Sequence, residues 1–242
     1  GLMVGHLARR AFGPYDLPIP RPPSDELAIV PANLDQFATD WSLPRDDVRL
    51  WVCLDAIAHH AVLGRPHVRD RLTSLLHEYA GGFQPDPEAL SGRLEQLDPS
   101  DQSSWEQVFG DPEALLGSME SARQREIKPH LEALTAAIEG YVDWTLDEVG
   151  GRLIGSYGPL SEALRRRRVE ANSGDRFVER MFGLQLSQQQ YDRGEAFVRG
   201  VIERAGDAGL VRLWRSEREL PTPAEVDAPG LWLARIDLPA GA

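Results

Sequence analysis

Cysteine is almost absent from this sequence, and long apolar runs are missing altogether. The single cysteine, Cys53, rules out an internal disulfide framework, which suits a reducing cytoplasm. No run of roughly 18 or more apolar residues occurs, so the sequence offers no transmembrane helix and predicts no membrane partner. With 242 residues, 42% of them apolar, the chain can bury one substantial core. We therefore expect a cytoplasmic globular protein in which Cys53 packs rather than reacts.

Positive charge is also scarce. The chain has 26 Lys and Arg against 38 Asp and Glu, a net charge of -12, which argues against a nucleic-acid partner because phosphate binding needs a basic field. The one basic block, residues 165–168, has Glu162 and Glu170 beside it and is predicted to be a solvated helix face rather than an anion site. The sequence contains no G-x-S-x-G elbow, P-loop or dinucleotide fingerprint, so those enzyme classes have no support.

What the sequence does contain is an apolar stretch over residues 48–63, interrupted by few strongly polar side chains: Arg49, Asp55, His59 and His60. Such a stretch is typical of a helix that runs through the core. Asp55 and His59 are four residues apart and project from one face of that helix. A carboxylate in such a place is unfavourable unless another group pairs with it.

A second stretch, residues 128–149, has the apolar spacing of an amphipathic helix and carries Glu139 and Asp143. Their E-x-x-x-D spacing places both carboxylates on one face. By spacing alone they are either part of a site or a solvated carboxylate pair. Three histidines that follow the core stretch are predicted to be surface or hydrogen-bonded core residues: His67, His77 and His130.

The remaining pattern predicts a mostly helical chain. Leu27–Val30 is the best strand candidate, because it is short, apolar and bounded by turn residues. Residues 86–107 are polar and interrupted by proline, and favour a surface excursion over a lid. Besides the two stretches above, helices are expected at 2–11, 33–41, 68–79, 112–119, 161–170, 175–182, 187–205 and 208–215.

The core stretch and its flanks resemble a bacterial family of zincin-like metallopeptidases. The resemblance extends over nearly the whole chain and is carried by residues 48–54 (VRLWVCL), His59-His60, 64–69 (GRPHVR), 13–17 (GPYDL), 220–226 (LPTPAEV) and 229–235 (PGLWLAR). Members of that family carry His-Glu-x-x-His-His where this chain has Asp55-Ala-Ile-Ala-His59-His60. The two histidines of such a motif bind zinc and the Glu is the general base.

The resemblance implies roles for five residues here. Asp55 replaces the first histidine ligand, His59 is the second, and Glu139 corresponds to the third ligand, from a later helix. Asp143 corresponds to the carboxylate that orients a ligand from behind, and is expected behind Asp55. Ala56 occupies the general-base position, and a methyl group cannot accept a proton. A metal set of Asp55, His59 and Glu139 is therefore expected to be vestigial or weak, with no catalytic residue confirmed.

The fold class expected from this resemblance is α+β and predominantly helical, with a small sheet near Leu27–Val30 over the active-site helix. One domain should span residues 1–242, with the sheet and core helix in about 1–80 and a helical half in 81–242. The leading hypothesis is a zincin-like protein that has lost peptidase activity and holds no cofactor, and whose old cleft binds a peptide or small ligand. The alternative is an active hydrolase that uses zinc or another divalent metal on Asp55, His59 and Glu139. A third reading is a structural domain with no ligand.

Overall fold

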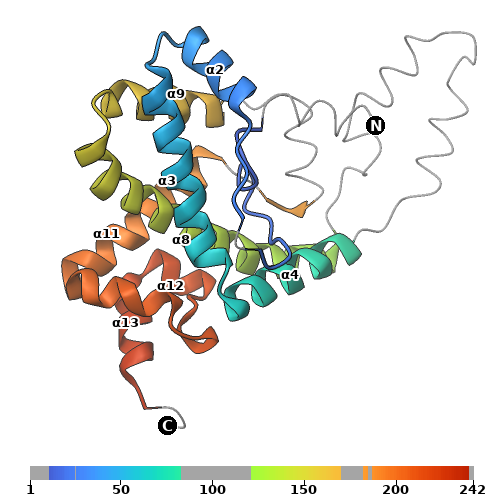
Figure 1. The fold of residues 1–242 in the computed structure, drawn as a ribbon. Coiled ribbons are helices and arrows are strands. Elements are labelled where there is room, and N and C mark those ends of the chain that lie inside the picture. Colours follow the sequence, from blue (N-terminus) through green and yellow to red (C-terminus); the bar gives the residue numbers. More distant parts are fainter. Residues whose placement is uncertain (1–10, 25, 83–120, 170–181, 185–186, 240–242) are drawn as a thin grey trace, which may run out of the picture.

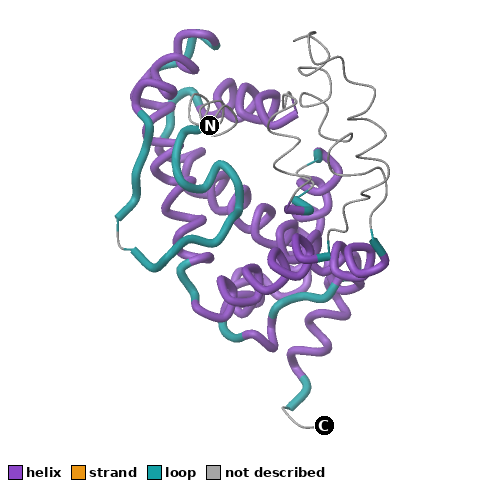
Figure 2. Tube along the Cα trace, turned by 90° about the vertical axis from the view of Figure 1, so that its right-hand side faces the viewer, coloured by secondary structure: helices purple, strands orange, loops and turns teal. Residues whose placement is uncertain are grey.

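The computed structural model describes residues 11–24, 26–82, 121–169, 182–184 and 187–239. The regular elements of the described part are all helices, joined by loops (Figures 1 and 2). In chain order they are α2 Pro31–Asp40, α3 Arg45–Leu63, α4 Pro66–Gly81, α8 Ala122–Leu153, α9 Tyr157–Val169, α11 Gln188–Val211, η1 Arg212–Trp214, η2 Glu217–Glu219, α12 Pro223–Asp227 and α13 Pro229–Asp237. None of these helices is long and apolar enough to cross a membrane.

The predicted sheet is wrong for the described residues, none of which lies in a strand. Leu27–Val30 is extended, but the amide of Val30 donates a single backbone hydrogen bond, to the carbonyl of Phe12, at 2.8 Å. A strand needs a ladder of such bonds with a neighbour, and the next residue, Pro31, already begins α2. The segment is therefore an extended lead into a helix, and the fold is all-α where it is described.

The predicted core helix is confirmed as α3, Arg45–Leu63, which follows Pro44. Asp46 and Asp47 lie in its first turn, where carboxylates are favoured by the helix dipole. Asp47 also accepts hydrogen bonds from the backbone amide and hydroxyl of Ser156, at 2.9 and 2.6 Å, which ties the start of α3 to the chain just before α9. One face of α3 is buried along its length: Val48, Trp51, Val52, Ala56, Ala58, His59, Val62 and Leu63.

Helix α8 is the longest element and packs against α3, α4 and α11. It begins at Ala122, before the predicted start at residue 128, because Ser121 and Gln124 form a capping box there. Its closest neighbour is α11. A Cβ atom on Gly140 would lie 2.3 Å from the backbone of Gly194, so only glycine allows the two helices to approach this closely. This crossing holds the Glu139 and Asp143 segment of α8 against α11.

Most of the remaining helices match the sequence prediction. α2, α4 and α9 lie where they were expected. The two helices predicted at 187–205 and 208–215 correspond to α11, which is kinked at Gly206 with φ of 62°, and to η1, which follows it. The C-terminal helices α12 and α13 were not predicted. The helices expected at 2–11 and 112–119, most of that at 175–182, and the segment 86–107 lie outside the described residues.

Candidate functional site

His59 lies at the centre of the predicted site, on the buried face of α3, with 3% of its surface exposed. Its Nδ1–H donates to the backbone carbonyl of Asp55 at 3.1 Å, and the Asp55 carboxylate lies 3.4 Å from the same nitrogen. On the other edge of the ring, Nε2 lies 3.4 Å from Oε1 of Glu139, which belongs to α8 and is itself buried. The ring of Tyr15 stacks on the imidazole, with centroids 5.7 Å apart and planes 9° from parallel.

The carboxylates favour the charged form of His59. Burial by itself lowers the pKa of the imidazole, but Asp55 and Glu139 outweigh it and hold that pKa well above its ordinary value of 6.5. The protonated ring then donates from both nitrogens, one to each side. A buried Glu139 thus has a cationic partner supplied by the chain itself, as a buried carboxylate requires.

The structure brings Asp55, His59 and Glu139 together, but not around one point. Asp55 lies at the Nδ1 edge of the imidazole and Glu139 at the Nε2 edge. Ligands of one metal ion must all point to the same position, and within the described residues no group of three or more His, Cys, Asp or Glu side chains has such an arrangement. The zinc that the zincin motif implies therefore does not fit this donor set. Ala56 is buried beside it and offers only a methyl group.

Asp143 has a different partner from the one expected. Both its carboxylate oxygens accept hydrogen bonds from the guanidinium of Arg168, each at 2.9 Å. This is a bidentate ion pair, the strongest geometry for Arg with a carboxylate. Arg168 comes from the C-terminal end of α9 and also covers the ring of Tyr191, 4.6 Å from the ring centroid. Asp143 thus joins α8 to α9, and orients a cation of the chain instead of a metal ligand.

Arg168 remains fully charged in this position. Burial lowers the pKa of its guanidinium, but Asp143, Tyr191 and Glu139 together raise it well above the ordinary value. Because Glu139 contributes to that effect, the positive charge of Arg168 acts on both carboxylates of α8. His59 and Arg168 between them supply the positive charge that a zinc ion supplies in a zincin site.

The solvated face predicted for residues 165–168 is only half right. Arg165 and Arg166 pair with Glu162 at the surface, as expected. Arg167 and Arg168 point inward, and Arg167 covers the ring of Phe12 at 3.7 Å. The helical spacing could have indicated that Arg168 points inward, because Arg168 follows the buried Leu160 and Leu164 in steps of four.

Two further aromatic residues belong to the site and were not predicted as such. The hydroxyl of Tyr15 lies 3.0 Å from Nδ1 of His60, so His60 faces Tyr15 while His59 faces the carboxylates. Trp51, one turn before Asp55 on α3, is 7% exposed, and its indole nitrogen has no hydrogen-bond partner in the described part of the chain. Tyr15 lies inside the GPYDL segment, but no spacing in the sequence connects it with α3.

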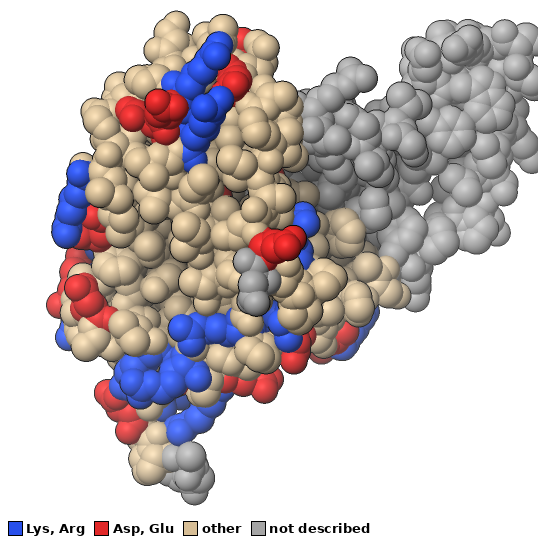
Figure 3. All heavy atoms as spheres, viewed as in Figure 1, with Lys and Arg blue, Asp and Glu red and all other residues tan. Residues whose placement is uncertain are grey.

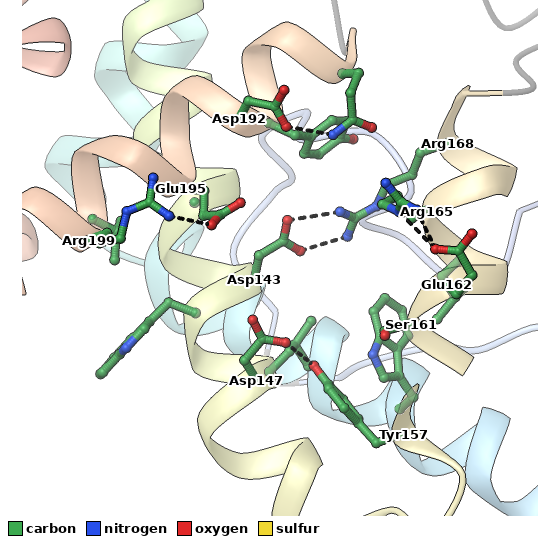
Figure 4. A pocket seen from close by; sticks show the side chains of 18 of the residues that line it. Asp143, Asp147, Tyr157, Ser161, Glu162, Arg165, Arg168, Asp192, Glu195 and Arg199 are labelled. Atoms are coloured by element: carbon green, nitrogen blue, oxygen red, sulfur yellow. Dashed lines mark hydrogen bonds and ion pairs between the residues drawn. The ribbon is translucent and has the colours of Figure 1, made fainter. Parts of the chain in front are cut away.

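Beside this cluster is an open cavity of about 430 Å³ between α8, α9 and α11, with Trp51 of α3 in its wall. Figure 4 shows Asp143 and Asp147 pointing into it from α8, opposite Arg168 of α9. Four aromatic side chains line it, together with six carboxylates and three arginines: Trp51, Trp144, Tyr157 and Tyr191; Asp143, Asp147, Glu162, Asp192, Glu195 and Glu203; Arg165, Arg168 and Arg199. On the face in Figure 3, by contrast, acidic and basic side chains are interspersed.

Comparison with known proteins gives two matches. The zincin-like metallopeptidase family matches residues 1–233. A crystal structure from Chloroflexus aurantiacus, described as a candidate hydrolase with a novel fold, superimposes with a TM-score of 0.69 at 26% sequence identity, and the alignment covers 98% of this chain and 67% of that one. A search of curated proteins found no match.

Proposed function

This chain belongs to the zincin-like metallopeptidase family, and from that premise we propose that it binds a peptide in the cleft beside α3 without hydrolysing it. The observation that carries the proposal is the pair of substitutions at the start of the motif. Asp55 lies on the wrong edge of His59 to share a metal with Glu139. Ala56 removes the base that activates a metal-bound water, and loss of a general base alone slows such reactions by about 10²–10⁴-fold.

The charge arrangement supports the same proposal. A zincin site that simply lost its metal would leave Glu139 buried without a positive partner, which is strongly unfavourable. Here His59 pairs with Glu139, and Arg168 pairs with Asp143. The chain therefore has its own neutralising groups and gains no electrostatic relief from a metal.

The cavity supports a retained binding role. Its volume of about 430 Å³ falls within the range of about 300–1,000 Å³ that is usual for ligand pockets. It adjoins the His59 cluster through Trp51 of α3 and Asp143 of α8, which both line it. Peptide binding there would use a cavity that the chain already has.

One specific observation favours the alternative, an active metal-dependent hydrolase. Nε2 of His59 and Oε1 of Glu139 are 3.4 Å apart, and two ligands of a tetrahedral zinc ion also lie roughly 3.4 Å apart. The alternative needs Asp55 to turn to the other edge of the ring, and a base in place of Ala56.

Metal content separates the two functions. The purified chain is dialysed against zinc, washed, and measured by plasma mass spectrometry beside His59→Ala. We expect substoichiometric zinc that this substitution does not change. Near-stoichiometric zinc that is lost in the variant would support the hydrolase and refute the proposal.

The converse experiment restores the motif. In the double variant Asp55→His/Ala56→Glu, a histidine one turn before His59 replaces the carboxylate at the Nδ1 edge. We expect this variant to gain zinc, because Glu139 is already beside Nε2. The control Asp55→His/Ala56→Gln should gain zinc but no peptidase activity, since an amide cannot act as the base. A folded double variant without zinc affinity would show that Glu139 is not the third ligand.

A further inference from the structure

The loop of residues 12–16 lies over the two histidines of α3. It contains no helix or strand and runs beside α3 (Figure 1). Tyr15 of this loop is 8% exposed, and its ring stacks on the imidazole of His59 with centroids 5.7 Å apart. Its hydroxyl lies 3.0 Å from Nδ1 of His60. One tyrosine therefore covers a face of the first imidazole and occupies a nitrogen of the second.

The carboxylate of Asp16 holds the loop in this shape. It accepts hydrogen bonds from the backbone amides of Phe12 and Gly13, at 3.0 and 3.1 Å. Its Oδ2 also accepts a hydrogen bond from the guanidinium of Arg167 at 3.0 Å, across 151 residues of chain. A single carboxylate thus closes the turn and attaches it to the C-terminal end of α9.

Phe12 attaches the loop to the same arginine a second time. The guanidinium of Arg167 lies over the Phe12 ring, 3.7 Å from its centroid, in a cation–π contact. Phe37 of α2 meets the same ring edge to face, with centroids 5.2 Å apart. The end of α9 is itself held in place, because Arg168 pairs with Asp143 of α8. Arg167 therefore fastens the loop to the helical body of the protein.

Backbone hydrogen bonds add little to this attachment. Among the described residues, one backbone–backbone bond joins the loop to another segment, from the amide of Val30 to the carbonyl of Phe12 at 2.8 Å. A segment with so few backbone bonds can open locally while the helices around it stay folded. The contacts of Arg167 therefore have a large share in keeping the loop closed.

We propose that residues 12–16 form a movable cover over His59 and His60, which Arg167 holds closed. In the closed state Tyr15 keeps ligands away from the covered face of His59 and from Nδ1 of His60. Loss of the Arg167 contacts lets the loop move away while α3 and α9 remain folded. The cover acts on the histidine face of α3 and does not depend on what the cavity binds.

The test is the rate at which diethyl pyrocarbonate modifies each histidine of the full chain, measured by mass spectrometry of its peptides. His77 and His130 are exposed and serve as internal references. In the wild type His60 should react about tenfold more slowly than either, because it becomes accessible only when the loop opens. Arg167→Met should raise the His60 rate about tenfold, since a hydrogen bond between charged groups is worth about that factor.

Two further variants on the same contact act as partner and control. Asp16→Asn keeps an oxygen for the turn amides but loses the charge, so it should also raise the His60 rate. Combined with Arg167→Met it should add nothing, because both changes break one ion pair. Arg166→Met is the matched control. Arg166 pairs with Glu162 at the surface, and its loss should leave the His60 rate unchanged.

Tyr15→Ala removes the covering ring and separates a cover from a general effect on stability. In this variant His60 should react as fast as the exposed references, and adding Arg167→Met should not raise the rate further. The milder Tyr15→Phe, which loses only the hydroxyl bonded to His60, should give part of the same increase. The proposal is overturned if His60 already reacts as fast as His77 in the wild type. Equal rates in Arg167→Met and Arg166→Met, or a further increase from Arg167→Met in the Tyr15→Ala background, would overturn it too.

Discussion

Replacing Arg168 tests whether its guanidinium neutralises the carboxylates of α8, Asp143 and Glu139. Arg168→Met keeps much of the side-chain bulk but removes the charge and both hydrogen bonds to Asp143. The side chains of this pair are 23% and 31% exposed, which is intermediate between a surface pair and a buried one. Exposed pairs contribute up to about 1 kcal/mol and broken buried pairs cost about 3–5 kcal/mol. We therefore expect a loss of about 2 kcal/mol in the free energy of unfolding.

The double-mutant cycle isolates the interaction. Asp143→Asn removes the charge that Arg168 compensates, so in its presence Arg168→Met should cost less, with a coupling energy of about 1–2 kcal/mol. Glu139 still depends on Arg168, so the rescue should be incomplete. The assay is urea unfolding at neutral pH, monitored by tryptophan fluorescence. The unfolding free energy should fall with urea concentration at the same slope for all four proteins.

Arg165→Met is the matched control on the same helix. Its guanidinium pairs with Glu162 at the surface, where the Arg165 side chain is 61% exposed, so its loss should change stability by no more than about 0.5 kcal/mol. If Arg168→Met costs no more than Arg165→Met, or if the cycle is additive, Arg168 does not neutralise the carboxylates of α8.

Two further predictions test His59 and the helix crossing. The folded pKa of His59 lies well above 6.5, so the stabilising effect of the charged ring is complete below about pH 6.5 and is lost as pH rises through the folded pKa. The difference in unfolding free energy between wild type and His59→Gln, measured in urea, should therefore narrow from pH 6 to pH 9. A difference that stays constant would contradict the charged pair with Glu139. Gly140→Ala places a Cβ 2.3 Å from the backbone of Gly194 and should lower the thermal midpoint, at a cost of about 1–3 kcal/mol. The control is Gly151→Ala on the same helix, where the nearest neighbour of the added Cβ would be 4.0 Å away, so this variant should be neutral or stabilising. Equal changes in the thermal midpoint for Gly140→Ala and Gly151→Ala would refute the close crossing.

The sequence predicted those features of the fold that depend on local pattern. The apolar period gave α3, α4 and most of α8, and the four-residue spacing correctly placed Asp55 and His59 on one face. It could not give the edge of the imidazole on which Asp55 lies, because both edges are compatible with the same spacing. The contact of His59 with Glu139 spans 80 residues of chain, and only the family resemblance connected them.

The errors have a common physical cause, which is that the deciding partner is distant in sequence. Leu27–Val30 has the composition of a strand, but a strand exists only if another strand pairs with it. Arg168 has the composition of a surface residue, but Asp143 and Tyr191 provide a partly buried place for it. A run of four arginines shows its charge, and not which of the four turns inward.

Positions 55 and 56 would each have disabled a zincin site in a different way, and their consequences for the fold differ. Replacing the general base with Ala56 removes a polar group from a buried position and leaves nothing unpaired. Replacing a neutral histidine with Asp55 adds a negative charge at the Nδ1 edge of His59, whose Nε2 edge already faces Glu139, so the cluster would be destabilised unless positive charge increased nearby. The raised pKa of His59 provides that charge from within the cluster, and Arg168 provides it from α9. It follows that Ala56→Glu alone should not restore function and should destabilise the fold, since it adds a third carboxylate to a cluster whose cations are already paired, whereas Asp55→His alone should be tolerated.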